Sequence, residues 1–189
     1  MIHKIYHLLT NFKSNHTIFL LLSFFFYATM VGLWHIDNNS LPTSDAAAYL
    51  NDAYVRYNVF FEKGFLAGFV ELYSSRAWRP QIFSIFITPF LLLFGSNPLN
   101  SVLIISTLCA GLLSAYVYLI LRLHIKPFLS FLAAIFILSF SFIYNIYVTF
   151  FSEIIYLPLI LASFYYLIKS ENFTNISISS NYSFQLLKA

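Results

Sequence analysis

Residues 99–121 read LNSVLIISTLCAGLLSAYVYLIL, without a single Asp, Glu, Lys, Arg or His. A helix needs about 20 consecutive apolar residues to cross the hydrocarbon core of a bilayer, so this stretch predicts a membrane-crossing helix. The whole chain has the same character. Of its 189 residues, 60% are hydrophobic and only 9% are charged, whereas a soluble domain has roughly 25% charged residues. The composition therefore predicts an integral membrane protein.

Further apolar runs set the expected architecture. Runs long enough, or nearly long enough, to cross a membrane also occupy 17–35, 127–148 and 153–168. A fifth run, 81–95, is shorter and contains Pro89. The sequence thus predicts an all-α integral membrane protein with about four long transmembrane helices. Amphipathic or re-entrant juxtamembrane helices are expected in the first external loop.

The same pattern divides the chain into two parts. Residues 1–170 are predicted to form one polytopic membrane module, whose first external loop covers 36–98. Residues 171–189 turn polar and rich in Ser and Asn, which predicts a polar C-terminal tail or a truncated loop.

Charges near the N-terminus predict the orientation. Lys4 and Lys13 precede the first apolar run, and positively charged residues favour the cytoplasmic side of a membrane. That run is longer than the core of a signal peptide and lacks a small-residue cleavage site, so we interpret it as a retained anchor. We expect a multi-pass protein, integral to the cytoplasmic (inner) membrane, with a cytoplasmic N-terminus.

The short run 81–95 leaves two topologies open. If it crosses fully, the basic cluster at 122–126 lies outside and Glu153 lies inside. If it lies in the interface or re-enters, that cluster and Lys169 are cytoplasmic and Glu153 is external. The positive-inside rule favours the second topology, which also places Asp45 and Glu153 on one face.

The first loop contains a predicted amphipathic helix. From Ser44, a suitable N-cap, apolar or long side chains recur every three to four residues at Tyr49, Ala53, Val55 or Arg56, and Phe60. Asp45 falls in the first turn, where the helix dipole favours negative charge. Asp52 is expected to be solvated.

The external face would present acids beside arginines. A carboxylate such as Asp45 or Glu153 can act as a general base on a hydroxyl or amine. Arg76 and Arg79 lie near the predicted headgroup region, and the guanidinium fork suits a phosphate. This combination suits a reaction on a phosphate-linked lipid. The net charge of +3 and the scattered basic residues argue against nucleic-acid binding.

Three short motifs occur one after another along the pattern of apolar runs. They are Asp45-Ala46-Ala47-Ala48-Tyr49 after the first span, Arg79-Pro80 opening a short apolar helix that ends in Phe94-Gly95, and Ser152-Glu153 opening the last span. Over about residues 15–170 the chain resembles the N-terminal module of GT-C membrane glycosyltransferases. The similarity is greatest to the dolichyl-phosphate-mannose protein mannosyltransferase-like and aminoarabinose-transferase-like families.

The resemblance implies a function and a set of roles. Such enzymes transfer a sugar from a polyprenyl-phosphate donor to an acceptor on the extracytoplasmic face. By resemblance, Asp45 is the catalytic base and Glu153 the second catalytic acid, while Arg79, Arg76 and Tyr49 bind substrate. No cofactor is firmly implied. A divalent metal is left open, because Ser44-Asp45-Ala46 stands where many relatives have consecutive acids.

The expected partners are a lipid-linked sugar donor, membrane lipids and further helices of a longer or split protein. Because relatives continue through several more helices, the isolated chain is expected to be incomplete or inactive. The alternative hypothesis is a non-catalytic membrane protein, such as an accessory subunit, a scaffold or a small transporter component. Transporters tend to hold polar groups near the middle of the membrane, whereas these acids lie at predicted helix ends.

Overall fold

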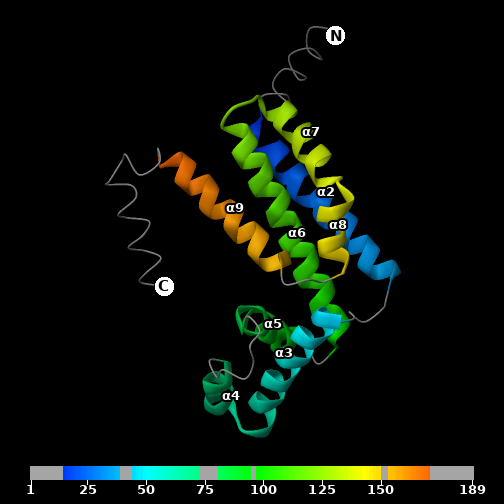
Figure 1. Cartoon of the computed structure of the whole chain (residues 1–189), viewed down its shortest axis with the longest axis vertical. Coiled ribbons are helices and arrows are strands. Elements are labelled where there is room, and N and C mark those ends of the chain that lie inside the picture. The colour runs from blue at the N-terminus through cyan, green and yellow to red at the C-terminus, as the bar shows by residue number, and fades with distance from the viewer. Residues whose placement is uncertain (1–14, 39–43, 73–80, 95–96, 150–152, 171–189) are drawn as a thin grey trace.

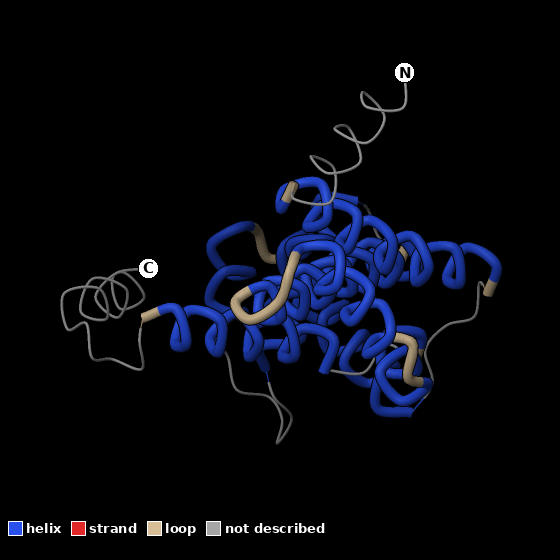
Figure 2. Tube along the Cα trace, turned by 90° about the horizontal axis from the view of Figure 1, so that it is seen from above, coloured by secondary structure: helices blue, strands red, loops and turns tan. Residues whose placement is uncertain are grey.

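The computed structural model describes residues 15–38, 44–72, 81–94, 97–149 and 153–170. In these residues all regular structure is helical (Figures 1 and 2). The helices are α2 (His16–Asp37), α3 (Ser44–Glu62), α4 (Phe65–Leu72), α5 (Gln81–Phe94), α6 (Pro98–Arg122), α7 (Pro127–Leu138), α8 (Ser141–Val148) and α9 (Glu153–Lys169). The predicted all-α class is confirmed for this part of the chain.

The crossing of α2 and α6 is the most extensive helix contact in the structure. Small side chains let the two backbones approach each other. The Ser114 hydroxyl donates to the Ser23 carbonyl oxygen over 2.8 Å, and the two hydroxyl oxygens lie 2.9 Å apart. Gly111 faces the Phe24 ring, where an added Cβ atom would lie 2.7 Å from a ring carbon. In lipid, close packing and hydrogen bonds of this kind hold helices together.

Two of the four predicted long spans are confirmed. Among the described residues, α2 and the Leu99–Arg122 part of α6 are long and apolar enough to cross a membrane. The run predicted at 153–168 forms α9, which has 17 residues. At 1.5 Å per residue α9 is about 26 Å long, short of the roughly 30 Å hydrocarbon core. The expectation of four long transmembrane helices is therefore wrong for the described residues.

The run predicted at 127–148 is broken into α7 and α8, which are bent by 71°. At the break, the Ser139 hydroxyl donates to the Ile135 carbonyl oxygen over 2.7 Å, and Phe140 has an extended backbone. A side chain that binds a backbone acceptor competes with the helical ladder. If the bent pair is counted as one crossing, the described residues contain up to three candidate membrane crossings.

The helices α3, α4 and α5 form a second group, at the end of the bundle where α2 ends and α6 begins (Figure 1). Leu50 and Ala53 of α3 are buried in one apolar cluster with Ile87 and Leu91 of α5. The Thr88 hydroxyl of α5 also lies 3.4 Å from the Ala53 carbonyl oxygen. The short run thus packs on the first-loop helix and on α6. The topology in which 81–95 does not complete a crossing stays a prediction.

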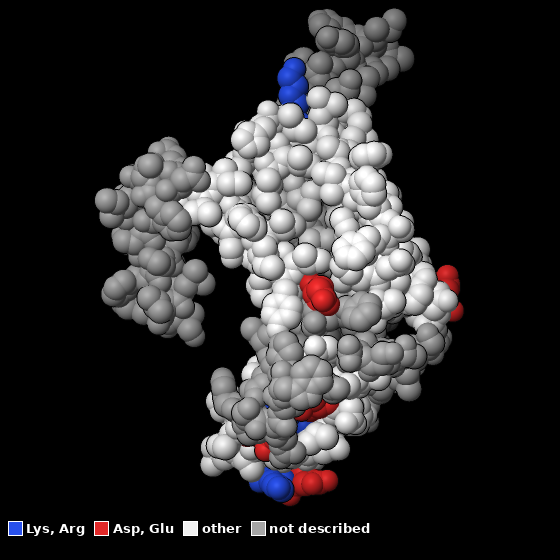
Figure 3. Space-filling model, viewed as in Figure 1, with Lys and Arg blue, Asp and Glu red and all other residues white. Residues whose placement is uncertain are grey.

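The opposite end of the bundle is basic. Arg122 lies in the last turn of α6, Lys126 precedes α7, and Lys169 ends α9. The Lys169 ammonium lies 5.8 Å from the centre of the Tyr165 ring, which in turn contacts Tyr116 of α6. Among the described residues, the face shown in Figure 3 carries no charged side chain between a basic group at the upper end of the bundle and acidic groups farther down. This band matches the surface expected of a membrane-embedded bundle.

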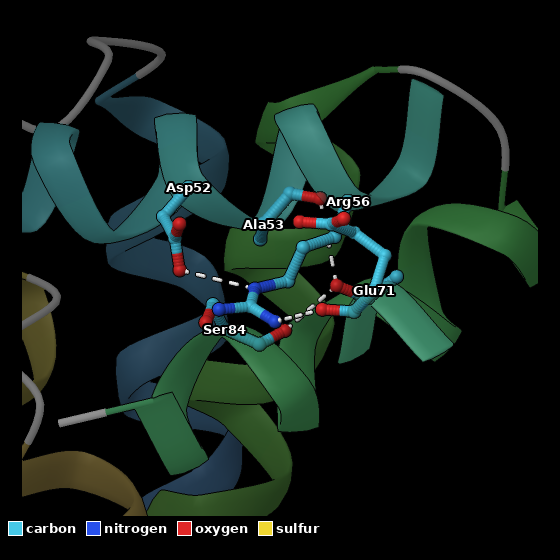
Figure 4. Close-up of polar contacts among 6 residues, drawn as sticks. Asp52, Ala53, Arg56, Glu71 and Ser84 are labelled. Atoms are coloured by element: carbon cyan, nitrogen blue, oxygen red, sulfur yellow. Dashed lines mark hydrogen bonds and ion pairs between the residues drawn. The ribbon is translucent and has the colours of Figure 1, made fainter. Parts of the chain in front are cut away.

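A buried arginine holds the second group of helices together (Figure 4). The Arg56 side chain of α3 is only 1% exposed, and its Nε donates to the Asp52 carboxylate over 3.2 Å. Its Nη1 donates to the Glu71 carbonyl oxygen of α4, and Ser84 of α5 lies beside the guanidinium. Asp52, which was expected to be solvated, is 27% exposed and also forms an ion pair with Arg56. The guanidinium therefore ties α4 to α3 with hydrogen bonds to a charged and a neutral acceptor.

The chain returns from α3 to α4 through a glycine turn. Gly64 has a φ of +84°, a left-handed conformation that is costly for residues with a Cβ atom. Four residues later, Gly68 lies directly against the Phe60 ring, and a Cβ atom there would overlap the ring. The two glycines let α4 fold back closely enough for Glu71 to reach Arg56.

The topology predicts which residues share a membrane side. Cysteines at the exposed positions Asp37 and Asn100 should react together with a membrane-impermeant thiol reagent, and a cysteine at the exposed position His124 should show the opposite response. The single native Cys109 is buried and can be replaced by Ser for a silent background. Labelling in intact and permeabilised cells makes the measurement. Opposite responses at positions 37 and 100 would mean that the run between them crosses the membrane.

The Arg56 contacts predict a local loss of structure. Arg56→Met keeps much of the apolar stem but leaves the Glu71 carbonyl and the Asp52 carboxylate without this donor, which should cost about 1–3 kcal/mol. We expect faster amide hydrogen exchange in α4 and a lower unfolding temperature. Lys63→Met removes an exposed cation next to α4 and is the matched control, expected within about 0.5 kcal/mol of the wild type. Equal behaviour of the two variants would rule out the bridging role.

Candidate functional site

The two candidate acids lie in the first turns of two different helices. Asp45 is the second residue of α3, as the sequence predicts, although its side chain lies outside the described side chains. Glu153 is the first residue of α9, and its side chain is exposed. The positive end of a helix dipole stabilises a carboxylate in such a position. Both acids therefore lie at helix N-termini, and a general base of the proposed kind would be a carboxylate.

An apolar cluster joins the N-terminal parts of these two helices. Leu50 of α3 and Ile154 and Ile155 of α9 are buried in it, and the half-buried Tyr49 packs against it. The N-terminal parts of α3 and α9 thus share one core. Tyr49 also follows Asp45 by four residues, so both lie on one face of α3.

The start of α9 is held by contacts with α2 and α8. His35, near the end of α2, has its Nε2 3.1 Å from the Tyr147 carbonyl oxygen of α8. The Tyr147 ring makes an edge-to-face contact with Tyr27 of α2, with ring centres 6.0 Å apart. Its hydroxyl donates to the Ile154 carbonyl oxygen over 3.4 Å. These contacts connect α2, α8 and the start of α9 next to Glu153.

A small cavity lies at the same end of the bundle. It has a volume of about 130 Å³ and lies between the end of α2 and the start of α6. Its polar lining comes from His35, Asn38 and Asn100, and its remaining lining is aliphatic. Amide and imidazole groups of this kind can bind hydroxyl groups of a ligand. The described part of the chain therefore offers polar recognition groups at the end that carries the candidate acids.

The arginines between α2 and α6 divide into two cases. Arg76 and Arg79 lie outside the described residues, so their roles remain predictions. Arg56, which sequence reasoning treated only as part of an amphipathic face, is buried and bound to Asp52 and to α4. It has a structural position inside the first-loop layer. The Asp-x-x-x-Arg spacing on the predicted buried face of α3 was the signal that could have identified this pair.

The described residues contain no group of three or more His, Cys, Asp or Glu side chains that could hold a metal ion. The Asp45 side chain is not among those described. Metal dependence therefore stays as open as the sequence left it. Sequence reasoning also missed Tyr156, which follows Glu153 by three residues and so shares its face of α9.

Comparison with known proteins identifies the family. The family model described as dolichyl-phosphate-mannose-protein mannosyltransferase matches residues 79–178. This segment contains α5 to α9, including Glu153, and Arg79 begins it. No curated protein and no solved structure shows a significant match to the chain. The family match covers more than half of the chain and agrees with the resemblance noted in its motifs. The chain therefore belongs to the dolichyl-phosphate-mannose-protein mannosyltransferase family.

Proposed function

We propose that the chain is the glycosyltransferase module, or part of one, that transfers a sugar from a polyprenyl-phosphate donor to an acceptor. The reaction takes place on the extracytoplasmic face of the cytoplasmic membrane, with the N-terminus of the chain in the cytoplasm. The family supports a glycosyltransferase-like membrane protein. The observation that carries the site is the apolar cluster in which Leu50 of α3 and Ile154 of α9 are buried together and against which Tyr49 packs.

Asp45 is the proposed general base. Its carboxylate takes the proton of an acceptor hydroxyl or amine while the acceptor atom forms a bond to the anomeric carbon of the sugar. The bond between that carbon and the phosphate oxygen breaks, and the polyprenyl phosphate leaves with the bonding electron pair. Asp45 lies in the first turn of α3, and the positive end of a helix dipole favours negative charge.

The other proposed groups bind and orient the substrates. Glu153, at the start of α9, helps to shape the sugar site and accepts hydrogen bonds from sugar hydroxyls. Tyr49 lines the acceptor side of Asp45. Arg79 and Arg76 hold the donor phosphate, because a guanidinium donates two parallel hydrogen bonds to phosphate oxygens. Further helices of a longer or split protein would complete the walls around these groups, since group transfer needs reacting atoms held about 3–3.5 Å apart.

The proposed roles predict a loss of turnover without a loss of protein. Asp45→Asn keeps the size and much of the capping ability of the side chain but removes the base, so transfer should fall at least about 100-fold. Glu153→Gln should also reduce transfer. Native membranes, in which partner helices are retained, are offered a panel of polyprenyl-phosphate sugars. Acceptor-dependent release of the lipid phosphate is then measured against the level of the protein in the membrane.

Asp37→Asn is the matched control, because Asp37 is an exposed acid at the same end of the bundle with no proposed role in the reaction. It should transfer sugar at the wild-type rate. If Asp45→Asn does the same, Asp45 is a helix cap and the base lies elsewhere. If no donor supports turnover by wild-type membranes, the non-catalytic alternative gains support instead.

A further inference from the structure

A proline interrupts the hydrogen-bond ladder of α9. In an α-helix the amide N–H of each residue donates to the carbonyl oxygen four residues earlier. Pro158 lies inside α9 and has no N–H, so the Ile154 carbonyl lacks its regular donor. Ile154 is fully buried and Pro158 is buried as well. A buried carbonyl without a partner is costly, and a replacement donor is therefore expected.

The replacement comes from the preceding helix. The Tyr147 hydroxyl of α8 donates to the Ile154 carbonyl oxygen over 3.4 Å. Tyr147 has no exposed surface, so water does not compete for its hydroxyl. The carbonyl that the proline leaves open is therefore satisfied by a side chain of a neighbouring helix.

Contacts with α2 fix the position of Tyr147. The His35 imidazole binds its carbonyl oxygen, and the Tyr27 ring packs against its ring. The donor is thus held by the bundle, while the acceptor belongs to the first turn of α9. The hydrogen bond consequently joins the start of α9 to a fixed point on α2 and α8.

We propose that Tyr147 is a positioning residue whose hydroxyl replaces the amide N–H missing at Pro158. It thereby fixes the first turn of α9 and the acid Glu153 that begins it. The part that concerns catalysis rests on the proposed function, whereas the hydrogen-bond replacement stands independently of any activity. The proline remains useful in this arrangement because it leaves a carbonyl of α9 open to a donor from another helix.

Restoring an amide N–H at position 158 tests directly whether the Tyr147 hydroxyl replaces it. Tyr147→Phe keeps the ring on Tyr27 and removes only the hydroxyl, and in lipid nanodiscs it should lower the unfolding temperature by about 3 °C. Pro158→Ala gives the Ile154 carbonyl its regular donor. In that background Tyr147→Phe should change the unfolding temperature by less than about 1 °C. Equal shifts in the two backgrounds would overturn the proposal.

Tyr144→Phe is the matched control for this cycle. Tyr144 is a half-buried tyrosine of the same helix, and the structure gives its hydroxyl no hydrogen bond to α9. Its effect should be the same in the wild-type and the Pro158→Ala backgrounds. Hydrogen exchange supplies a second readout. The amide of Leu157, in the first turn of α9, should exchange faster in Tyr147→Phe and return to the wild-type rate in the double variant.

A separate measurement tests the effect of Tyr147 on catalysis. If the membranes transfer sugar, Tyr147→Phe should lower kcat about 10-fold with little change in KM, because misplacing a catalytic group affects the chemical step more than substrate binding. Tyr147→Phe combined with Pro158→Ala should recover kcat. A kcat that does not recover, although stability does, would remove the positioning role. Absence of transfer by wild-type membranes would contradict the proposed function while leaving the stability cycle as it stands.

Discussion

The close approach of α2 and α6 is the contact on which the remaining structure depends. Apolar surface alone does not hold helices together in lipid, so the shape of the contact determines the arrangement. Ser23, Ser114 and Gly111 supply that shape, because they allow backbone and hydroxyl contacts that larger residues would prevent. The crossing places the end of α2 beside the start of α6. The first-loop helices and the start of α9 then collect at this end of the bundle.

Charged residues occupy two kinds of position in this region. The candidate acids occur in first turns, at the positive end of a helix dipole. Arg56, in contrast, is buried and satisfied by Asp52 and by a carbonyl of α4. Under the proposed function, removing a candidate acid should change turnover more than folding, whereas removing Arg56 should change the packing of α3, α4 and α5. The two kinds of charged residue can therefore be studied separately.

The sequence predicted the parts of the structure that depend on composition and local signals. The spans at α2 and α6, the start of α3 at Ser44 and the start of α9 at Glu153 follow from apolar length and capping. The bend at Ser139 could not be predicted, because hydropathy does not show that the Ser139 hydroxyl donates to a backbone carbonyl oxygen of the helix. Nor did periodicity reveal that Arg56 would be buried, since the Glu71 carbonyl oxygen that it binds lies 15 residues later, on α4. The packing of Tyr49 against a cluster that includes Ile154 likewise depends on how α3 and α9 are placed relative to each other.

The pairing of Tyr147 with Pro158 also restricts the order in which this sequence can change. A chain that first replaces Pro158 regains a backbone donor and is then free to lose the hydroxyl at position 147. A chain that first loses the hydroxyl passes through a state in which the buried Ile154 carbonyl has neither donor. Under the proposed replacement, proline at position 158 is least costly while tyrosine stays at position 147, and relatives that lack the proline should show a wider choice of residues there.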